Sequence, residues 1–387
     1  MRILFPTSIF YPSQAGGPAN SVYFLAKELV KQGMEVFVFT TTIGINDLSK
    51  IKINEWNSVD GMNVYYSDRY WKHIPYNKIL ISDIPKVNLF HFSSFFDPFN
   101  LYFMILAKKR GTTCIISPRG ELLDAPLKLK KRKKRIFLKN YFVKFLFKNA
   151  ILHVTSDEEE GFVKEIYSNY FNKQLESRRT IFKVTNMLDN NLFSYENKSE
   201  NKKDYKYILY LGRISRKKNI ELLIEVYSKL DIDKNIKLFI AGNINEDIKY
   251  GQELKNKVKN LNLENRIIFS EKSIEGKEKE DLYYNAELFV TTTRSENFGM
   301  VILESLIRKT PVVTTKGTPW EELNRRQCGY WVDMELNSIK SAIENYFSLS
   351  DDEKNKMKEK GFKLAKEFSS EKLINEYVNM YRNVLNQ

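Results

Sequence analysis

The sequence contains little cysteine, with Cys114 and Cys328 as the two examples in 387 residues. They lie far apart, and neither belongs to a C-x-x-C or Cys/His cluster, so a disulfide scaffold is excluded and a zinc site has no ligand set. No stretch approaches the roughly 18 uninterrupted apolar residues that a membrane-spanning helix needs. The first residues also lack the charged region, apolar stretch and cleavage site of a signal peptide. We therefore expect a protein of a reducing, cytoplasmic compartment.

Aromatic residues make up 13% of the chain and hydrophobic residues 42%, which excludes intrinsic disorder and predicts a packed core. At roughly 100 to 200 residues per domain, the length predicts two domains. Lys and Arg number 62 against 48 Asp and Glu, which gives a formal net charge of +14. An excess of this size indicates acidic partners, among which nucleic acid, anionic lipid and phosphorylated small molecules stay open.

Short apolar runs alternate with amphipathic stretches along most of the chain. A strand over residues 3–5, a helix over about 19–31 and a strand over 35–40 form a βαβ unit. The alternation stops at a polar segment rich in Asn and Lys and restarts with a strand over 207–211. This pattern predicts an α/β fold with two doubly wound domains, whose ligands lie at the carboxyl ends of the strands.

The composition also predicts the domain boundaries. The first domain covers residues 1–188, a linker follows at 189–206, and the second domain covers 207–370. A closing helix at 371–387 is expected to pack back toward the first domain. A cleft between the two domains is the default position for an active site.

The most informative window is 294–304, with the sequence RSENFGMVILE. Glu296 lies in a loop just beyond a predicted strand, Phe298 and Gly299 open a helix, and Glu304 follows about a turn and a half later. Exposed N–H groups at a helix start can hold a phosphate or a sugar oxygen, and two carboxylates can accept hydrogen bonds from vicinal hydroxyls. In the alternative interpretation, Glu296 only complements the helix dipole and Glu304 is a solvated residue.

A second window, 211–219 with the sequence LGRISRKKN, lies between the first strand and the first helix of the second domain. There Arg213 offers an anionic ligand a planar bidentate fork, and Lys218 offers it a point charge. The alternative is a basic loop that only caps the helix. Because both windows end strands of the same predicted domain, both should face the same crevice.

Together the two windows resemble the donor-site signatures of family 4 retaining glycosyltransferases, through Gly212, Arg213, Lys218, Glu296, Phe298, Gly299 and Glu304. The resemblance extends over nearly the whole chain. It implies the GT-B fold, an α/β fold in which two Rossmann-like domains face each other across a deep cleft. It also implies that residues 1–188 bind the acceptor and residues 207–370 bind the nucleotide sugar. Similar enzymes assemble bacterial surface polysaccharides such as O-antigen and capsule.

The resemblance assigns a role to each matching residue. Arg213 and Lys218 would contact the donor diphosphate, Glu296 would hold hydroxyls of the transferred sugar, and Glu304 would hold the ribose hydroxyls. Glu296, Arg213 and Lys218 are thus the expected catalytic residues. The other expected donor-binding residues are Gly16, Gly17, Arg266, Ile268, Phe298, Gly299, Met300 and Val301.

The resemblance implies neither a bound cofactor nor a metal, because a nucleotide sugar of UDP or GDP type is a co-substrate. Asp231 and Asp233 have the D-x-D spacing of a metal site, but we interpret them as a turn. The implied reaction moves a sugar with retention to a saccharide acceptor, on a diphosphate lipid, in O-antigen, capsule or exopolysaccharide assembly. The alternative on the same fold is a sugar-nucleotide-modifying enzyme such as an epimerase.

Three residues of the first domain are candidate contacts to the acceptor or the sugar. Arg119, in the sequence Ser117-Pro118-Arg119-Gly120, stands where many relatives have a histidine, and it could read an anionic group or instead pair with a carboxylate such as Glu121. His91 and His153 end predicted strands. For His153 the alternative is an imidazole satisfied inside the core.

Basic residues concentrate in 128–135, which holds seven cations in eight residues, and aromatic residues follow up to 147. A basic helix with an aromatic face predicts attachment to an anionic membrane surface through residues 128–147. Alternatively, the aromatic face packs on the sheet and the cations are solvated. Nucleic-acid binding is the competing function from another class, but it gives no reason for the Glu296 and Glu304 pair, so we expect no nucleic-acid partner. The expected location is peripheral, on the cytoplasmic face of the membrane.

Overall fold

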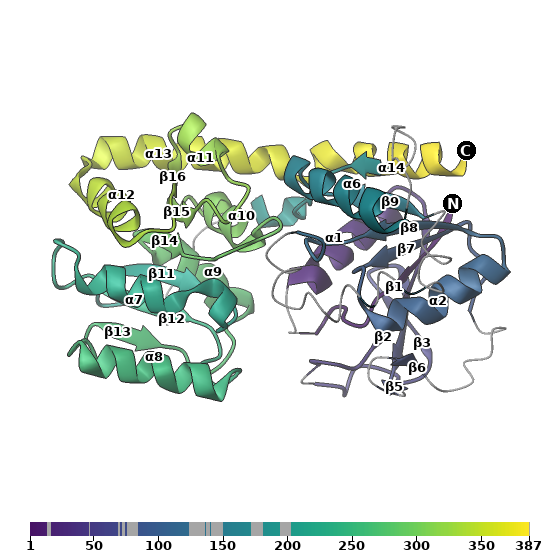
Figure 1. Cartoon of the computed structure of the whole chain (residues 1–387), viewed down its shortest axis with the longest axis horizontal. Helices are drawn as coiled ribbons and strands as arrows, with labels where there is room; N and C mark the ends of the chain where they lie inside the picture. The colour runs from purple at the N-terminus through teal and green to yellow at the C-terminus, as the bar shows by residue number, and fades with distance from the viewer. Residues whose placement is uncertain are drawn as a thin grey trace. The chain divides into compact units, whose positions relative to one another are not determined.

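The computed structural model describes residues 1–13, 17–45, 47–68, 70–71, 74–75, 84–123, 136, 140, 150–171, 181–193 and 203–386. The chain forms two compact units (Figure 1). Unit 1 consists of Met1–Asn190 and Phe368–Gln387, and unit 2 consists of Asn191–Glu367. The closing helix of the chain therefore belongs to unit 1, although the whole of unit 2 precedes it in the sequence.

The described residues of unit 1 form an eight-stranded sheet in the order β10-β9-β8-β7-β1-β2-β4-β3. All pairs are parallel except β3 with β4. The strands are β1 Arg2–Pro6, β2 Glu35–Thr41, β3 Trp56–Val59, β4 Met62–Ser67, β7 Leu89–Ser93, β8 Thr113–Ser117, β9 Ile151–Val154 and β10 Ile181–Lys183. A separate two-stranded sheet pairs β5 Tyr70–Trp71 with β6 Ile74–Pro75.

Helices cover both faces of this sheet because successive residues of a buried parallel strand point to opposite sides. Leu4 packs in one core with α2 Pro98–Lys109 and α6 Asp157–Phe171. Its neighbours Ile3 and Phe5 pack in the other core, with α1 Gly17–Lys31 and α14 Ser370–Leu385. The last helix of the chain thus completes a core that begins at the first strand.

Unit 2 is a second doubly wound layer structure, with a fully parallel sheet in the order β13-β12-β11-β14-β15-β16. Helices α7, α8 and α12 pack in one core with it, and α10 contacts α9 and α13. The strands are β11 Tyr207–Leu211, β12 Lys237–Ala241, β13 Ile267–Phe269, β14 Leu288–Thr291, β15 Val312–Thr315 and β16 Gly329–Val332. The helices are α7 Ile220–Ser228, α8 Ile248–Asn260, α9 Gly276–Asn285, α10 Met300–Ile307, α11 Glu322–Arg325, α12 Leu336–Ser348 and α13 Asp351–Ala365, and short 3₁₀ turns are η1 Asn190–Phe193, η2 Arg216–Lys218 and η3 Lys366–Phe368.

The sequence pattern does not reveal α2. This helix starts at Pro98, and the Asp97 carboxylate caps it by accepting a hydrogen bond from the N–H of Phe99 at 3.0 Å. Its sequence, PFNLYFMILAKK, is apolar on nearly every side, so it lacks the polar face that marks an amphipathic helix. The antiparallel edge strand β3 and the edge strand β16 are also missing from the predicted pattern.

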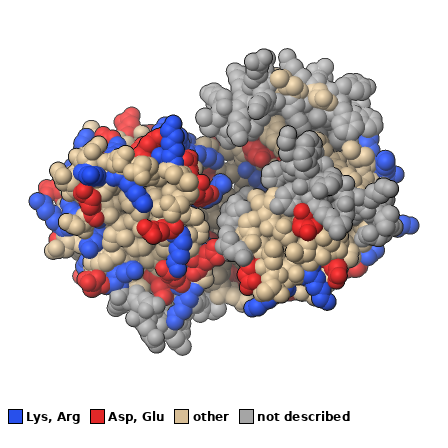
Figure 2. Space-filling view, turned by 90° about the horizontal axis from the view of Figure 1, so that it is seen from below, with Lys and Arg blue, Asp and Glu red and all other residues tan. Residues whose placement is uncertain are grey.

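Charged side chains are spread over the surface of the described residues. On the face shown in Figure 2, Lys and Arg are interspersed with Asp and Glu. The basic stretch 128–135 lies outside the described residues. Within the described part of the chain, no helix combines the length and the apolar composition that crossing a bilayer requires.

Candidate active site

The two basic and acidic windows meet at the carboxyl edge of the unit 2 sheet. Strand β11 ends at Leu211 and its parallel neighbour β14 ends at Thr291, so the loops that follow them lie side by side. Lys218, from the first loop, forms an ion pair with Glu296, from the second. The side chains of this pair retain 16% and 22% of their exposure, so it is largely withdrawn from water but open on one side. The two windows therefore meet at one edge of the unit 2 sheet, as expected.

Three cations set the charge of Glu296. Burial alone would raise the pKa of its carboxyl group, but Lys218, Lys217 and Arg213 more than offset this effect and lower the pKa below its ordinary value. Glu296 is consequently a carboxylate, able to accept hydrogen bonds. Arg213 is exposed and forms no ion pair with another described residue. Its guanidinium is thus open to an anionic ligand beside the Lys218–Glu296 pair.

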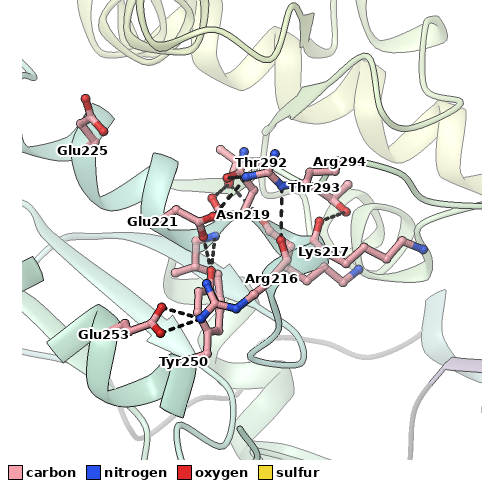
Figure 3. A network of polar contacts seen from close by, with 12 residues as sticks. Arg216, Lys217, Asn219, Glu221, Glu225, Tyr250, Glu253, Thr292, Thr293 and Arg294 are labelled. Atoms are coloured by element: carbon pink, nitrogen blue, oxygen red, sulfur yellow. Dashed lines mark hydrogen bonds and ion pairs between the residues drawn. The ribbon is translucent and has the colours of Figure 1, made fainter. Parts of the chain in front are cut away.

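A second set of contacts clamps the loop that carries Lys217 and Lys218 (Figure 3). Arg294 donates from Nη2 to Oδ1 of Asn219 at 2.7 Å, and its backbone N–H donates to the carbonyl oxygen of Lys217 at 2.9 Å. The Thr292 hydroxyl donates to the carbonyl oxygen of Asn219 at 2.9 Å. Asn219 itself has φ 55°, a left-handed conformation that Asn tolerates better than most residues. These bonds fix the two strand-end loops to each other.

Three further side chains, from α7 and α8, support the same loop. Glu221 accepts from the Tyr250 hydroxyl and from Arg294, and Arg216 lies 5.0 Å from the Tyr250 ring centroid (Figure 3). Arg216 also donates to both carboxylate oxygens of Glu253 at 2.6 Å. Arg216 is therefore engaged by the protein, whereas Arg213 remains available.

Helix α10 begins beside Glu296, and no side chain caps its N-terminus. Gly299 occupies the N-cap position with φ 82° and offers no side chain to cap the first turn. Phe298 is buried against Trp320, whose indole N–H donates to the Phe298 carbonyl oxygen at 2.5 Å. This contact fixes the turn. The first N–H groups of the helix, at Met300 and Val301, have no side-chain cap and can donate to an anionic or hydroxyl ligand.

Glu304 lies about one turn further along the same helix, and its side chain is buried rather than solvated. Its Oε2 accepts from the Tyr283 hydroxyl at 3.1 Å and pairs with Lys279 at 2.8 Å. Burial, and then Glu304, raise the pKa of Tyr283 well above its ordinary value, so the hydroxyl stays protonated and donates. Oε1 has no partner among the described residues and can accept from a ligand hydroxyl.

Comparisons with known proteins agree with this geometry. Residues 193–364 match the family Glycosyl transferases group 1. That part of the chain is a group 1 glycosyltransferase domain. Over 335 residues the chain is 27% identical to the alpha-monoglucosyldiacylglycerol synthase of Streptococcus pneumoniae, a match that covers 83% of this chain and 72% of that protein. It is 23% identical to the N-acetyl-alpha-D-glucosaminyl L-malate synthase of Bacillus anthracis, over 56% of this chain and little more than half, 57%, of that protein.

Solved structures extend the similarity in fold to the full length of the chain. The sucrose-phosphate synthase of Thermosynechococcus elongatus aligns with a TM-score of 0.76 at 17% identity, over 100% of this chain and 99% of that one. Anabaena HepE, in complex with UDP and glucose, aligns with a TM-score of 0.72 at 15% identity, over 99% of both chains. The chain therefore has the GT-B fold, with two Rossmann-like domains.

One glycine of the glycosyltransferase domain permits a close backbone approach under the Arg213 loop. A Cβ at Gly242 would lie 2.1 Å from the carbonyl oxygen of Gly212. We expect Gly242→Ala to destabilise the protein by about 3 kcal/mol, because the backbone that carries Arg213 must move. Urea unfolding of the variant measures this loss.

Gly161→Ala is the matched control for Gly242→Ala, since nothing lies within 4 Å of a Cβ at Gly161, which is inside α6. The control is expected to keep or slightly raise stability. If the two variants had the same free energy of unfolding, the close approach of Gly242 to the carbonyl oxygen of Gly212 would be contradicted.

Arg266 is misplaced in the sequence prediction. It precedes β13, level with the amino ends of its neighbours, because Leu238 of β12 is registered with Ile267. Its guanidinium stacks on the Tyr227 ring at 5.0 Å from the centroid. Arg266 therefore lies at the edge of the sheet opposite to Arg213 and Glu296 and is not a donor contact, and Ile268 lies midway along the strand. At the carboxyl edge the corresponding residue is Ser270, whose N–H donates to the Ile240 carbonyl oxygen at 3.0 Å.

Other expected residues fall into two groups. Gly17 is the first residue of α1, whereas Gly16 lies outside the described residues, as does nearly all of 128–147. The turn interpretation of Asp231 and Asp233 is confirmed, since Asp233 accepts through its carbonyl oxygen from Ile236 N–H at 3.0 Å. No cluster of three or more metal-ligating His, Cys, Asp or Glu side chains is found in the described part of the chain.

In unit 1, Arg119 follows the carboxyl end of β8, and its Nη1 donates to Oδ1 of Asn186 at 2.6 Å. The alternative pairing with Glu121 is wrong, because that carboxylate accepts from the N–H groups of Phe95 and Phe96. Arg119 thus remains a candidate substrate contact with a neutral partner.

The expected substrate contacts through His91 and His153 are wrong. Their residues are 1% and 0% exposed, and every ring nitrogen has a partner within unit 1. A fully buried imidazole has no surface to offer a sugar. The core interpretation of His153 is correct, and it extends to His91.

Sequence reasoning missed the residues that hold the predicted ones in place, namely Asn219, Arg294, Lys279, Tyr283 and Trp320. Arg294 is the first residue of the 294–304 window, but its contacts to Lys217 and Asn219 depend on which strand neighbours β11. Lys279 and Tyr283 lie on α9, where i and i+4 spacing places them on one face. That spacing indicates a contact with Glu304 only when α9 is known to pack against α10, and the sequence alone does not show this packing.

Proposed function

We propose that this protein is a retaining glycosyltransferase that moves a sugar from a nucleotide-sugar donor, of UDP or GDP type, to a saccharide acceptor. The observation that carries the proposal is the meeting of Lys218 and Glu296 at two adjacent strand ends, with exposed Arg213 and the uncapped start of α10 beside them. Cations and N–H groups suit a diphosphate, while carboxylates suit sugar hydroxyls. One crevice therefore offers complementary groups to both halves of a nucleotide sugar.

The chemistry assigns a task to each group. The bond from the anomeric carbon to the diphosphate oxygen breaks, and the acceptor oxygen bonds to the anomeric carbon on the same face. Arg213, Lys218 and the first N–H groups of α10 stabilise the charge that develops on the diphosphate. The departing diphosphate takes the acceptor proton, and Glu296 orients the sugar rather than attacking it. Retention follows from this front-face path, and none of its steps calls for a metal.

We further propose that Glu304 holds the ribose hydroxyls through the free Oε1 and that the acceptor is carried on a diphosphate lipid, in O-antigen, capsule or exopolysaccharide assembly. The name of the pneumococcal relative, a glucosyldiacylglycerol synthase, supports a lipid-linked acceptor. The basic and aromatic residues 128–147 suit an anionic membrane surface. The protein would then work at the cytoplasmic face of the membrane.

A thermal-shift panel tests the donor site. UDP, GDP, ADP and CMP and their sugars are added at about 100 times the dissociation constant, where binding stabilises by about 2.7 kcal/mol. For a unit of this size the melting temperature should rise by about 5 to 10 °C with one base and not with the others. The Arg213→Ala/Lys218→Met variant is the control and should show no shift. Absence of a shift with every nucleotide would contradict the proposal.

A further inference from the structure

Buried side chains of unit 1 form a continuous chain of hydrogen bonds that the transfer chemistry does not use. The Tyr381 hydroxyl contacts Nδ1 of His91 at 2.8 Å, and Nε2 of His91 contacts the Ser117 hydroxyl at 2.7 Å. The Ser117 hydroxyl contacts Nδ1 of His153 at 2.6 Å, and Nε2 of His153 contacts the carbonyl oxygen of Val184 at 2.8 Å. The chain joins α14, β7, β8 and β9 to the segment after β10.

One end of this chain fixes the direction of every hydrogen bond. A carbonyl oxygen can only accept, so Nε2 of His153 carries a proton, and Nδ1 of the neutral ring accepts from Ser117. The Ser117 oxygen then accepts from Nε2–H of His91, and Nδ1 of His91 accepts from Tyr381. Both imidazoles are therefore neutral Nε2–H tautomers, consistent with burial that lowers the pKa of His153 to about 3.

The end of the chain lies two residues from the partner of Arg119. His153 holds the carbonyl oxygen of Val184, and the Tyr377 hydroxyl of α14 donates to the carbonyl oxygen of Thr185 at 3.0 Å. Asn186, which follows, is 5% exposed and accepts from Arg119 at 2.6 Å. The carbonyl groups of Val184 and Thr185 are thus held by side chains of the core, and the side chain of the next residue, Asn186, holds the Arg119 guanidinium.

The surroundings of Arg119 leave its charge uncompensated among the described residues. The neighbouring carboxylates bind other groups. Glu121 of the loop accepts from the N–H groups of Phe95 and Phe96 and from the Ser94 hydroxyl, and the fully buried Glu159 of α6 accepts from the N–H of Gly120 at 2.6 Å. Arg119 Nε is buried and has no described hydrogen-bond partner. Charged groups withdrawn from water are normally paired, so a half-buried cation facing an amide calls for an anion from outside.

We propose that Asn186, fixed by the buried hydrogen-bond chain, is a positioning residue that holds Arg119 in uncharged surroundings to bind an ionised group of a substrate. The ionised group is a phosphate, diphosphate or carboxylate, carried by the acceptor or by the donor. This inference rests on the proposed transferase function, since it assigns Arg119 to a substrate. The amide is the suitable partner because it accepts one hydrogen bond without neutralising the guanidinium.

Asn186→Asp separates this role from a merely structural one. Aspartate keeps the accepting oxygen, so a structural role would leave catalysis unchanged. In a positioning role the new carboxylate neutralises Arg119, and KM for the substrate with the ionised group should rise about 10- to 100-fold while kcat and the melting temperature change little. The substrate whose KM rises identifies the acceptor or the donor as the source. Asn88→Asp is the charge control, because Asn88 also accepts through Oδ1, from the Arg2 N–H, but at the amino edge of the sheet.

A second readout does not depend on transfer. Phenylglyoxal modification of Arg119, followed by peptide mass analysis, should be slowed by pyrophosphate in the wild-type protein and not in Asn186→Asp. If wild type transfers and both KM values of Asn186→Asp match those of wild type, the inference is overturned while the proposed function stands. If wild type transfers no sugar from any donor, the proposed function fails, and the pyrophosphate protection alone then supports or overturns the anion-binding role of Arg119.

Discussion

Transfer is expected to fall at least about 100-fold when Glu296 is replaced by Gln, with the fold retained, because an unoriented sugar no longer presents its anomeric carbon to the acceptor. Lys218→Met should lower kcat by about 100- to 1,000-fold, since one of the groups that stabilise the leaving diphosphate is lost. Each single variant also removes one partner of the ion pair from a site that is mostly closed to water. Breaking a buried pair costs about 3 to 5 kcal/mol, and the residual exposure of this pair reduces the expected loss to about 1 to 3 kcal/mol.

The double variant Lys218→Met/Glu296→Gln makes this prediction sharper. It removes both charges of the ion pair, so Lys218 is not left without its carboxylate. Its melting temperature should therefore exceed that of Glu296→Gln, whereas its activity should stay as low as that of the single variants. The matched control is Lys257→Met/Glu225→Gln, which removes an ion pair of 3.1 Å between α8 and α7, and it should transfer at the wild-type rate. Turnover of Glu296→Gln at the wild-type rate would overturn the assignment.

The site was largely predictable because it depends on strand ends rather than on side-chain contacts. Periodicity identified where β11 and β14 end, and parallel strands bring such ends to one edge. The pairing of Lys218 with Glu296 was not predictable, because it requires β14 to be the neighbour of β11. The two residues were predicted to contact different parts of the donor, the diphosphate and the transferred sugar, and in the structure without a ligand they pair with each other.

The error at Arg266 has a physical origin. The predicted donor contacts Arg266 and Ile268 lie before and within β13, which is three residues long. The two ends of a strand lie at opposite edges of a sheet, so an error of two or three residues at so short a strand moves a predicted contact from the carboxyl edge to the amino edge. A three-residue uncertainty in a boundary is harmless within a helix and decisive at a short strand.

The histidines could not be placed for a different reason. Their hydrogen bonds join residues up to 290 positions apart, from His91 to Tyr381. Local pattern indicated that each histidine ends a strand, where a ligand contact and a core contact look alike. The placement of the histidines depends on α14, which follows the whole of unit 2 in the sequence but packs in the core of unit 1. There Tyr381 of α14 contacts His91.

The buried histidines should make unit 1 sensitive to acid. Burial, then the charge of His153 and of Arg119, lower the pKa of His91 well below its ordinary value, and burial lowers that of His153 to about 3. The unfolded chain therefore takes up protons near pH 6.5 that the folded unit does not. Stability is full above that pH and is lost as the pH falls, by about 4 kcal/mol between pH 8 and pH 5 for two histidines. Hydrogen exchange of unit 1 peptides in the whole protein, measured across this range, gives the change.

The variant His91→Gln/His153→Gln isolates the cause of this acid sensitivity. Its stability at pH 8 should be lower, because Gln does not reproduce the hydrogen-bond chain, but between pH 8 and pH 5 it should be nearly constant. Carboxylates contribute little in this window, since they titrate mainly below it. A wild-type unit 1 whose stability is unchanged from pH 8 to pH 5 would mean that the imidazoles accept protons in place. The neutral tautomers that hold Asn186, and through it Arg119, would then be wrong.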